Sequence, residues 1–97
     1  MLMKELLNRY QSQPNAILLD VRQPDEYEKG HIPGARNVPL QKLRDFSFEV
    51  TDRDTPLYVY CLSGGRSARA VRALRGVGYS DVTDLGGINS YTGPLEK

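Results

Sequence analysis

One stretch decides the fold: Leu57-Tyr58-Val59-Tyr60-Cys61-Leu62-Ser63-Gly64-Gly65-Arg66-Ser67, in a chain of 97 residues. Its first four residues are large, apolar or aromatic, and predict a strand. The glycine-containing part that follows predicts a loop over 61–65. After the loop, Ala70, Val71 and Leu74 have the spacing of the inward face of a helix over 66–75. Cys61 is therefore expected where a strand ends and a loop leads into a helix.

The segments on either side continue an alternation of helices and strands. Helical patterns cover 2–10 and 25–29, and a short helix or turn covers 40–46, whereas strand patterns cover 16–21, 35–38 and 81–85. Strands separated by helices predict an α/β fold, in which a small, mainly parallel sheet of about four to five strands is flanked by helices on both faces. Ligands bind such sheets at the carboxyl ends of the strands. Cys61 is expected at one of these ends.

The composition excludes several classes of protein. The length indicates one domain over 1–97. The chain is 39% hydrophobic and 26% charged, with a formal net charge of +1, so no global charge attracts it to nucleic acid or a membrane. The tyrosines are scattered and form no platform for bases. Because Lys4 and Glu5 interrupt the first residues and no long apolar run follows, we expect a cytoplasmic protein without a membrane partner.

Cys61 is the only cysteine. No intramolecular disulfide can form, no second thiolate is available for a zinc cluster, and we expect neither a metal nor a cofactor. A lone thiol fits a reducing compartment, where it is either a small core residue or a reactive group. The loop favours the reactive thiol, because a core cysteine needs neither two glycines nor an arginine directly after it.

The loop after Cys61 predicts an anion-stabilising cup. The N–H groups of a loop and of a first helical turn have no backbone acceptors, and the helix dipole adds partial positive charge there. Thiols in such places have pKa values of about 3.5–7.5, against about 8.5 for a free cysteine. Gly64 and Gly65 allow the chain to curl tightly, and Arg66 adds a cation with a planar fork of donors. The thiolate of Cys61 should therefore be favoured.

The length of the loop distinguishes two kinds of chemistry. Cysteine phosphatases hold a phosphate in a loop with one residue more between cysteine and arginine. Here four residues stand between Cys61 and Arg66. The smaller cup suits an outer sulfur atom on Cys61 better than a tetrahedral phosphate. A phosphatase or arsenate reductase on the same scaffold remains the less favoured alternative.

These segments resemble the rhodanese family, and the resemblance covers nearly the whole chain. The loop from Cys61 to Ser67 is similar to the Cys-x-x-Gly-x-Arg-Ser form of single-domain members. The other matching segments occur in family order: Asp20-Val21-Arg22 after a buried strand, Glu26-Tyr27-x-x-Gly30-His31-Ile32-Pro33-Gly34-Ala35 before the next strand, and Leu85-Gly86-Gly87 as the turn after the final strand. Together the four segments are specific for the family.

The resemblance implies a rhodanese-like fold and a sulfurtransferase of the thiosulfate sulfurtransferase type. Cys61 would attack the outer sulfur of a small anionic donor, either thiosulfate or a related persulfide or polysulfide, and become a persulfide. The groups implied to hold the donor and the terminal sulfur belong to Leu62, Ser63, Gly64, Gly65, Arg66 and Ser67. Because the chain has no second thiol, the acceptor must be external: cyanide, a thiol or a protein. A sulfur carrier with protein partners and little small-molecule turnover remains an alternative.

Other conspicuous residues are interpreted as structural. His31 lies in a turn that the family uses structurally. Asp20 and Arg22 should tie a neighbouring loop by hydrogen bonds. The chain departs from many family members in two ways. It has no clear segment for an additional first strand, and it has Tyr91 where a helix carrying a tryptophan is usual.

Overall fold

The computed structural model describes residues 2–97, in which four parallel strands form one sheet with the order β2-β1-β3-β4. Along the chain the elements are α1 (Met3–Gln11), β1 (Ile17–Asp20), α2 (Pro24–Lys29), β2 (Arg36–Asn37), the 3-10 turn η1 (Leu40–Lys42), α3 (Leu43–Glu49), β3 (Leu57–Cys61), α4 (Gly65–Gly76), β4 (Val82–Gly87) and the 3-10 turn η2 (Ile88–Ser90). The α/β fold class predicted from the sequence is confirmed.

The order of the strands reverses between β1 and β3. The chain leaves β1 toward β2 on one side and then returns to place β3 on the other side of β1. In parallel α/β sheets, the carboxyl ends of two such strands flank the position where ligands bind. Asp20 ends β1 and pairs in register with Tyr60, directly before Cys61, which ends β3. The topology therefore brings the segments after β1 and β3 together.

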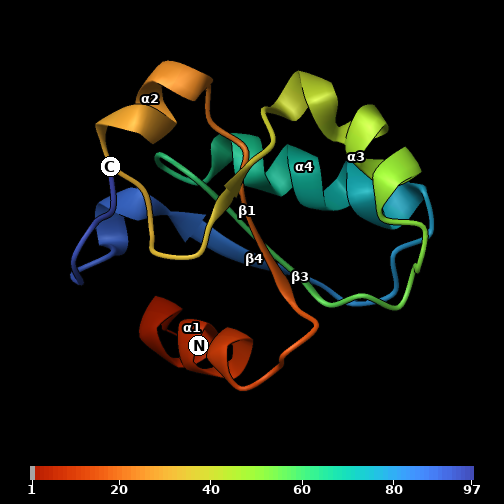
Figure 1. Cartoon of the computed structure of the whole chain (residues 1–97), viewed down its shortest axis with the longest axis horizontal. Helices are drawn as coiled ribbons and strands as arrows, with labels where there is room; N and C mark the ends of the chain where they lie inside the picture. Colours follow the sequence, from red (N-terminus) through yellow and green to blue (C-terminus); the bar gives the residue numbers. More distant parts are fainter. Residues whose placement is uncertain (1) are drawn as a thin grey trace.

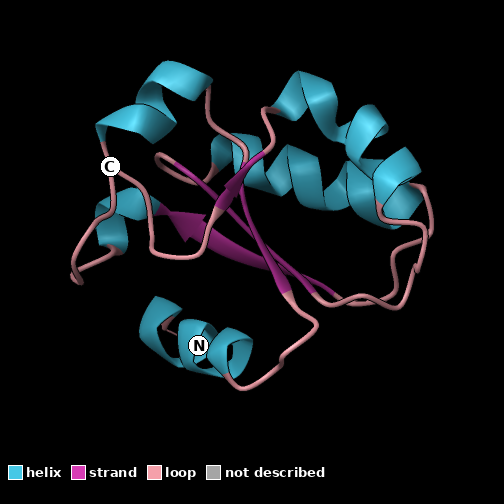
Figure 2. Cartoon of the chain, in the orientation of Figure 1, coloured by secondary structure: helices cyan, strands magenta, loops and turns pink. Residues whose placement is uncertain are grey.

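Alternate side chains of the strands enter two separate hydrophobic clusters. Leu57, Val59 and Cys61 belong to the cluster that includes residues of α3 and α4. Tyr58 and Tyr60 belong to the other cluster, which includes residues of α1. Figures 1 and 2 show α1 on one side of the sheet and α3 with α4 on the opposite side. The period of two along β3 thus buries both faces of the strand.

The prediction that Gly86 and Gly87 form a turn after the last strand is wrong. β4 continues through both glycines, and they pair with Tyr60 and Cys61. The register shifts where Val59 gives way to Tyr60, so that Leu85 is an extra residue on β4. Gly86 has a φ of +86°, in the left-handed region that favours glycine. The bulge bends the strand without ending its pairing.

Several other boundaries differ from the sequence-based expectations. The strand expected over 35–38 is reduced to Arg36–Asn37, at the edge of the sheet and before Pro39. The segment expected over 40–46 forms η1 and then α3, which runs on to Glu49. The last three residues of α3, 47–49, had no helical spacing of apolar residues that would have extended the prediction. The helix expected to begin at Arg66 begins at Gly65.

Candidate active site

We call residues 61–67 the Cys61 loop; they comprise Cys61 at the end of β3, the connection 62–64 and the first residues of α4. The side chain of Cys61 is buried, with 1% exposure. The N–H of Gly64 donates a hydrogen bond to the sulfur at 3.0 Å. Gly64 has a φ of +109°, so the sharp return of the loop requires glycine here. Gly65 has no positive φ and is the first residue of α4, so only Gly64 has the special conformation predicted for the glycine pair.

Hydrogen-bond donors around the sulfur lower the pKa of the Cys61 thiol. Burial by itself raises this pKa, but the Ser67 hydroxyl and the N–H groups of Ser67, Gly64 and Ser63 lower it by more. The Ser67 hydroxyl also lies 3.0 Å from the carbonyl oxygen of Gly64, and its single proton can be donated to either acceptor. The thiolate, which is the nucleophilic form, is favoured despite burial.

The Cys61 loop rests directly on β4. The Leu62 carbonyl accepts a hydrogen bond from the N–H of Asn89 at 3.2 Å. A Cβ atom on Gly87 would lie 2.6 Å from the Cα of Ser63 and would also collide with the Leu62 carbonyl oxygen. Such short distances are impossible for a real side chain. The loop can therefore pack against β4 only because position 87 is a glycine. The packing of the Cys61 loop against Gly87 could not be predicted from the sequence.

Arg66 is held by a carboxylate that the sequence analysis did not assign to the site. Its Nη1 donates to Oε1 of Glu26 at 2.7 Å, and its Nη2 donates to Oε2 at 2.9 Å. The Arg66 hydrogen bond lowers the pKa of Glu26 to about 2, although burial opposes this shift. Glu26 also accepts the N–H of Gln23, in a capping box at the start of α2. A motif search could find the Gln23–Glu26 spacing, but not a pair that is 40 positions apart.

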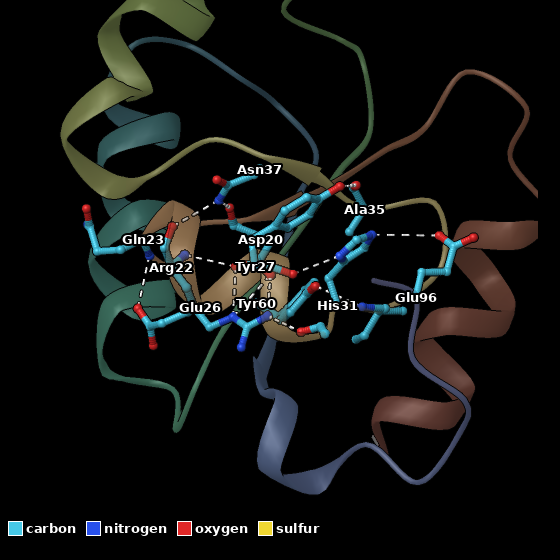
Figure 3. Close-up of polar contacts among 12 residues, drawn as sticks. Asp20, Arg22, Gln23, Glu26, Tyr27, His31, Ala35, Asn37, Tyr60 and Glu96 are labelled. Atoms are coloured by element: carbon cyan, nitrogen blue, oxygen red, sulfur yellow. Dashed lines mark hydrogen bonds and ion pairs between the residues drawn. The ribbon is translucent and has the colours of Figure 1, made fainter.

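Asp20 and Arg22 form the scaffold that the sequence predicted. Arg22 Nη2 donates to Oδ2 of Asp20 at 2.7 Å and to the carbonyl oxygen of Gly30 at 2.8 Å. Both side chains are buried, and Figure 3 shows them side by side, next to Tyr60. The hydroxyl of Tyr60 accepts the N–H of Ile32 at 3.0 Å. These bonds tie the turn after α2 to the ends of β1 and β3.

His31 has a structural role in this arrangement. Its ring stacks on Tyr27 with a centroid distance of 3.7 Å, and Nδ1 donates to the Tyr27 carbonyl oxygen at 2.9 Å. Its backbone exchanges two hydrogen bonds with Glu96, whose side chain approaches the ring from the C-terminal segment (Figure 3). No contact with Cys61 is among these interactions, so the geometry shows no Cys–His dyad within residues 2–97.

A groove of about 430 Å³ lies beside the Cys61 loop. Its walls come from α2, the loop and the C-terminal segment, and include Glu26, Lys29, Leu62, Ile88, Asn89 and Leu95. Leu62 is 41% exposed at its edge. Glu26 is neutralised by Arg66, whereas the side chain of Lys29 has no hydrogen bond or ion pair with any residue in 2–97. The groove thus offers an apolar wall and the unpaired ammonium group of Lys29 beside Leu62 of the Cys61 loop.

Of the residues predicted for the site, some act on the sulfur of Cys61 and others lie at the groove or the start of α4. Ser63, Gly64 and Ser67 contribute the groups that act on the sulfur of Cys61. Leu62 lines the groove, Gly65 is exposed at the start of α4, and Arg66 is paired with Glu26. Among residues 2–97 there is no cluster of three or more His, Cys, Asp or Glu that could hold a metal ion. The arrangement suits covalent chemistry at a stabilised thiolate.

Comparison with known sequences agrees with this geometry. The rhodanese-like domain family matches residues 2–93. The uncharacterized protein YqhL of Bacillus subtilis (strain 168) is 43% identical over 82 residues, which are 84% of this chain and 64% of YqhL. Thiosulfate sulfurtransferase PspE of Escherichia coli (strain K12) is 34% identical over 80 residues, 81% of this chain and 77% of PspE. The putative sulfur carrier protein YrkF of Bacillus subtilis (strain 168) is 38% identical over 80 residues, 81% of this chain and 43% of YrkF.

Solved structures show the same fold. The Alr3790 protein from Anabaena sp. superposes with a TM-score of 0.88 and 31% identity, covering 99% of this chain and 90% of that one. A rhodanese with anions from E. coli has a TM-score of 0.77 and 32% identity, covering 84% and 98%. The chain spans less than two thirds of YqhL and less than half of YrkF. On sequence and fold together, the chain belongs to the rhodanese-like domain family.

Proposed function

We propose that the chain moves sulfane sulfur from thiosulfate, or from a related persulfide or polysulfide, to a thiophilic acceptor through a persulfide on Cys61. One observation carries the proposal: the only cysteine lies under the N–H of Gly64, in a loop whose donors lower its pKa. These donors are already oriented before the reaction, so they stabilise negative charge on sulfur without reorganisation. The terminal sulfur of a persulfide would carry the same charge in the same cup.

The chemistry proceeds by two displacements at sulfur. The thiolate of Cys61 attacks the outer sulfur of thiosulfate, the bond between the two sulfurs breaks, and sulfite leaves with the electron pair. A second nucleophile, either cyanide or an external thiolate, then attacks the terminal sulfur of the persulfide. Cys61 leaves as a thiolate, and the donors that lower its pKa make it a better leaving group. No oxidant or reductant is consumed in either step.

The Cys61 loop is the proposed binding site for the donor. Arg66 keeps three of its five N–H donors outside the pair with Glu26, so an anion can be held without breaking the ion pair. Leu62 and Ser63 are exposed at the edge of the loop, where an incoming donor would meet them. Support for thiosulfate comes from the name of the relative PspE, which is a thiosulfate sulfurtransferase.

A sulfur carrier that serves protein partners is the second candidate. The groove beside the loop, of about 430 Å³, is larger than a small inorganic anion requires, and its apolar wall with Lys29 suits a peptide segment next to a partner's thiol. The relative YrkF is named as a putative sulfur carrier protein. The two candidates differ in turnover: a carrier passes sulfur fast only to its partner, whereas a thiosulfate sulfurtransferase turns over with cyanide.

We also propose that residues 1–97 act as one domain in the cytoplasm. The support is the lone thiol, which persists in reduced form in a reducing compartment. In residues 2–97 the helices are too short or too polar to traverse a bilayer. Cell fractionation followed by trapping of free thiols would place the protein, and recovery of Cys61 in an oxidised form from an exported fraction would contradict the cytoplasmic location.

Intact mass spectrometry of the reduced protein with thiosulfate tests the proposed function, with Cys61→Ser as the matched control. We expect the wild type to gain the mass of one sulfur atom, the variant to gain none, and cyanide to discharge the added sulfur. Loading by a polysulfide but not by thiosulfate would favour the carrier. If no donor loads Cys61, sulfur transfer is rejected, and phosphate and arsenate chemistry should be examined next.

A further inference from the structure

A second groove, of about 440 Å³, lies between α3 and α4 and includes no residue of the Cys61 loop. We call it the α3/α4 groove; its lining includes Leu43, Arg44, Ser47, Phe48, Ala73 and Val77. Phe48 and Val77 are 68% and 48% exposed, although each is apolar. Exposed apolar side chains that gather around a groove mark surfaces where proteins bind one another. Phe48 is thus a large apolar side chain that the fold leaves mostly in solvent.

The charges of this groove have one sign. Arg44 lies with its guanidinium carbon 5.9 Å from the centroid of the Phe48 ring. Arg53 donates to the carbonyl oxygens of Ser47 and Val50, which are neutral acceptors, and it has no ion pair within residues 2–97. Within residues 2–97 no carboxylate lines the groove. It therefore combines apolar contacts with uncompensated positive charge.

The carboxylates of α3 lie on another side of that helix. Asp45 and Glu49 line a separate cavity next to β2, and Glu49 pairs with Arg36 at 2.7 Å. The helix thus separates its charges, with the acids toward β2 and Arg44 toward α4. Within residues 2–97, this separation leaves the groove without a lining carboxylate that could compensate an arginine.

The positive charge continues along α4. Arg69, Ala73 and Val77 are spaced by four residues and so follow one stripe along the helix and its end. Arg69 is exposed, and its side chain forms no hydrogen bond or ion pair with any residue in 2–97. The stripe begins two residues after the Cys61 loop. A partner lying along it would meet Arg69 on the same stripe as Ala73 and Val77, which line the groove.

We infer that the α3/α4 groove binds an acidic amphipathic helix of a partner protein. Apolar side chains of that helix pack on Phe48 and Val77, and its carboxylates pair with Arg44 and Arg69. A groove between two helices accepts a third helix by interdigitation of side chains. The 12 residues of α4 extend about 18 Å, which matches about three turns of a partner helix. This binding requires no sulfur on Cys61, so it is independent of the proposed function.

The test is an NMR titration of the ¹⁵N-labelled full chain with a peptide of glutamate and leucine. The peptide is about 15 residues long, because shorter helices are marginal in water, and its leucines recur at helical spacing. We expect the amide signals of Phe48, Ala73 and Val77 to shift. Phe48→Ser and Arg44→Gln should each weaken binding, the first roughly tenfold or more, from the lost burial of a phenyl ring.

Control variants on another surface distinguish binding in the α3/α4 groove from nonspecific binding of the peptide. Leu2 is 71% exposed next to α1, so Leu2→Ser and Lys4→Gln remove the same kinds of group and should leave affinity unchanged. Val77→Ser provides a second variant of the groove in case Phe48→Ser fails to fold. Persulfide loading from thiosulfate should be the same in all these variants, which separates a failure of this inference from a failure of the proposed function.

Three results would overturn the inference. The first is the absence of shifts in α3 and α4 at saturating peptide. The second is equal binding of a peptide with lysine in place of glutamate, which would reduce the surface to a nonspecific apolar patch. The third is self-association of the protein alone that Phe48→Ser abolishes, because the occupant of the groove would then be a second copy of this chain.

Discussion

At the residue scale, the reactivity of Cys61 depends on two opposing effects on one sulfur atom. Burial raises the pKa of the thiol, and the donors of the Cys61 loop lower it by a larger amount. Most of these donors are backbone N–H groups, which a substitution to any residue other than proline leaves in place. The hydroxyl of Ser67 is the exception, and it is fully buried. Ser67 is therefore the position at which the stabilisation of the thiolate can be tested by substitution.

Ser67→Ala should slow alkylation of Cys61 by iodoacetamide at neutral pH about threefold to tenfold, since a hydrogen bond to a charged group is lost while burial is kept. The measurement is the rate of alkylation against pH, whose midpoint should move to higher pH in the variant. Ser63→Ala is the control, because Ser63 acts on the sulfur through its backbone N–H. Equal profiles for Ser67→Ala and the wild type would contradict the role of the hydroxyl.

At the scale of elements, a single ion pair joins α2 to the start of α4. Glu26 caps the first turn of α2 through Gln23 and also holds both arms of Arg66. The two side chains are 27% exposed, so water screens the pair only in part. The pair fixes the arginine at the edge of the Cys61 loop and keeps the two helices at a set separation.

This ion pair makes part of the stability depend on pH. The folded-state pKa of Glu26, about 2, is below its ordinary value of 4.5, so the unfolded chain takes up the proton first as the pH falls. The contribution of Glu26 is complete above about pH 4.5 and is lost as the pH falls to about 2. Glu26→Gln should therefore lose less of its free energy of unfolding than the wild type between these two pH values.

Urea unfolding at a series of pH values measures this difference. Glu28→Gln is the matched control on the same helix: Glu28 is exposed and has no ion pair within residues 2–97, so its variant should follow the wild-type curve. Parallel curves for Glu26→Gln and the wild type would show that the ion pair with Arg66 does not stabilise the folded state.

At the scale of the whole molecule, the Cys61 loop has its shape because β4 lies behind it. The last residue of β3 pairs with Gly87, and the next two residues of the loop pass over the same glycine. Ser67 reaches the same strand, with its hydroxyl 3.4 Å from the Gly86 carbonyl oxygen. The bulge in β4 sets where these glycines lie along β3. The loop is therefore placed by a strand that comes after α4 in the chain.

Gly87→Ala should displace the Cys61 loop, because the new methyl group would meet backbone atoms that cannot rotate away. We expect the free energy of unfolding to fall by about 1–3 kcal/mol and the loading of Cys61 with sulfur to be lost. Gly76→Ala is the control: its Cβ meets nothing within 4 Å, at the end of α4, and alanine is the better helix former. Denaturant unfolding measures the first effect and intact mass the second. Wild-type loading of Cys61 with sulfur in Gly87→Ala would show that the loop does not depend on a glycine at position 87.

Much of the fold could be predicted from the sequence. The alternation of helices and strands, and a parallel sheet flanked by helices on both faces, follow from patterns over a few adjacent residues. The place of Cys61 at the end of a strand, before a glycine in a left-handed conformation and a helix, is local in the same sense. The donors from the backbone of the loop follow from that local order, because a helix start always presents free N–H groups.

Other features depend on packing between segments that are far apart in the chain. Nothing in the sequence indicates that Glu26 pairs with Arg66. The sequence pattern places Gly87 in a turn, and only the structure shows that the Cys61 loop packs against it. The order of the strands, the bulge in β4 and the α3/α4 groove likewise arise only when the helices and the sheet are assembled. Local patterns specify which elements form and where the sulfur lies along the chain. Which side chains meet depends on the packing of those elements, since each such contact joins residues that no local rule connects.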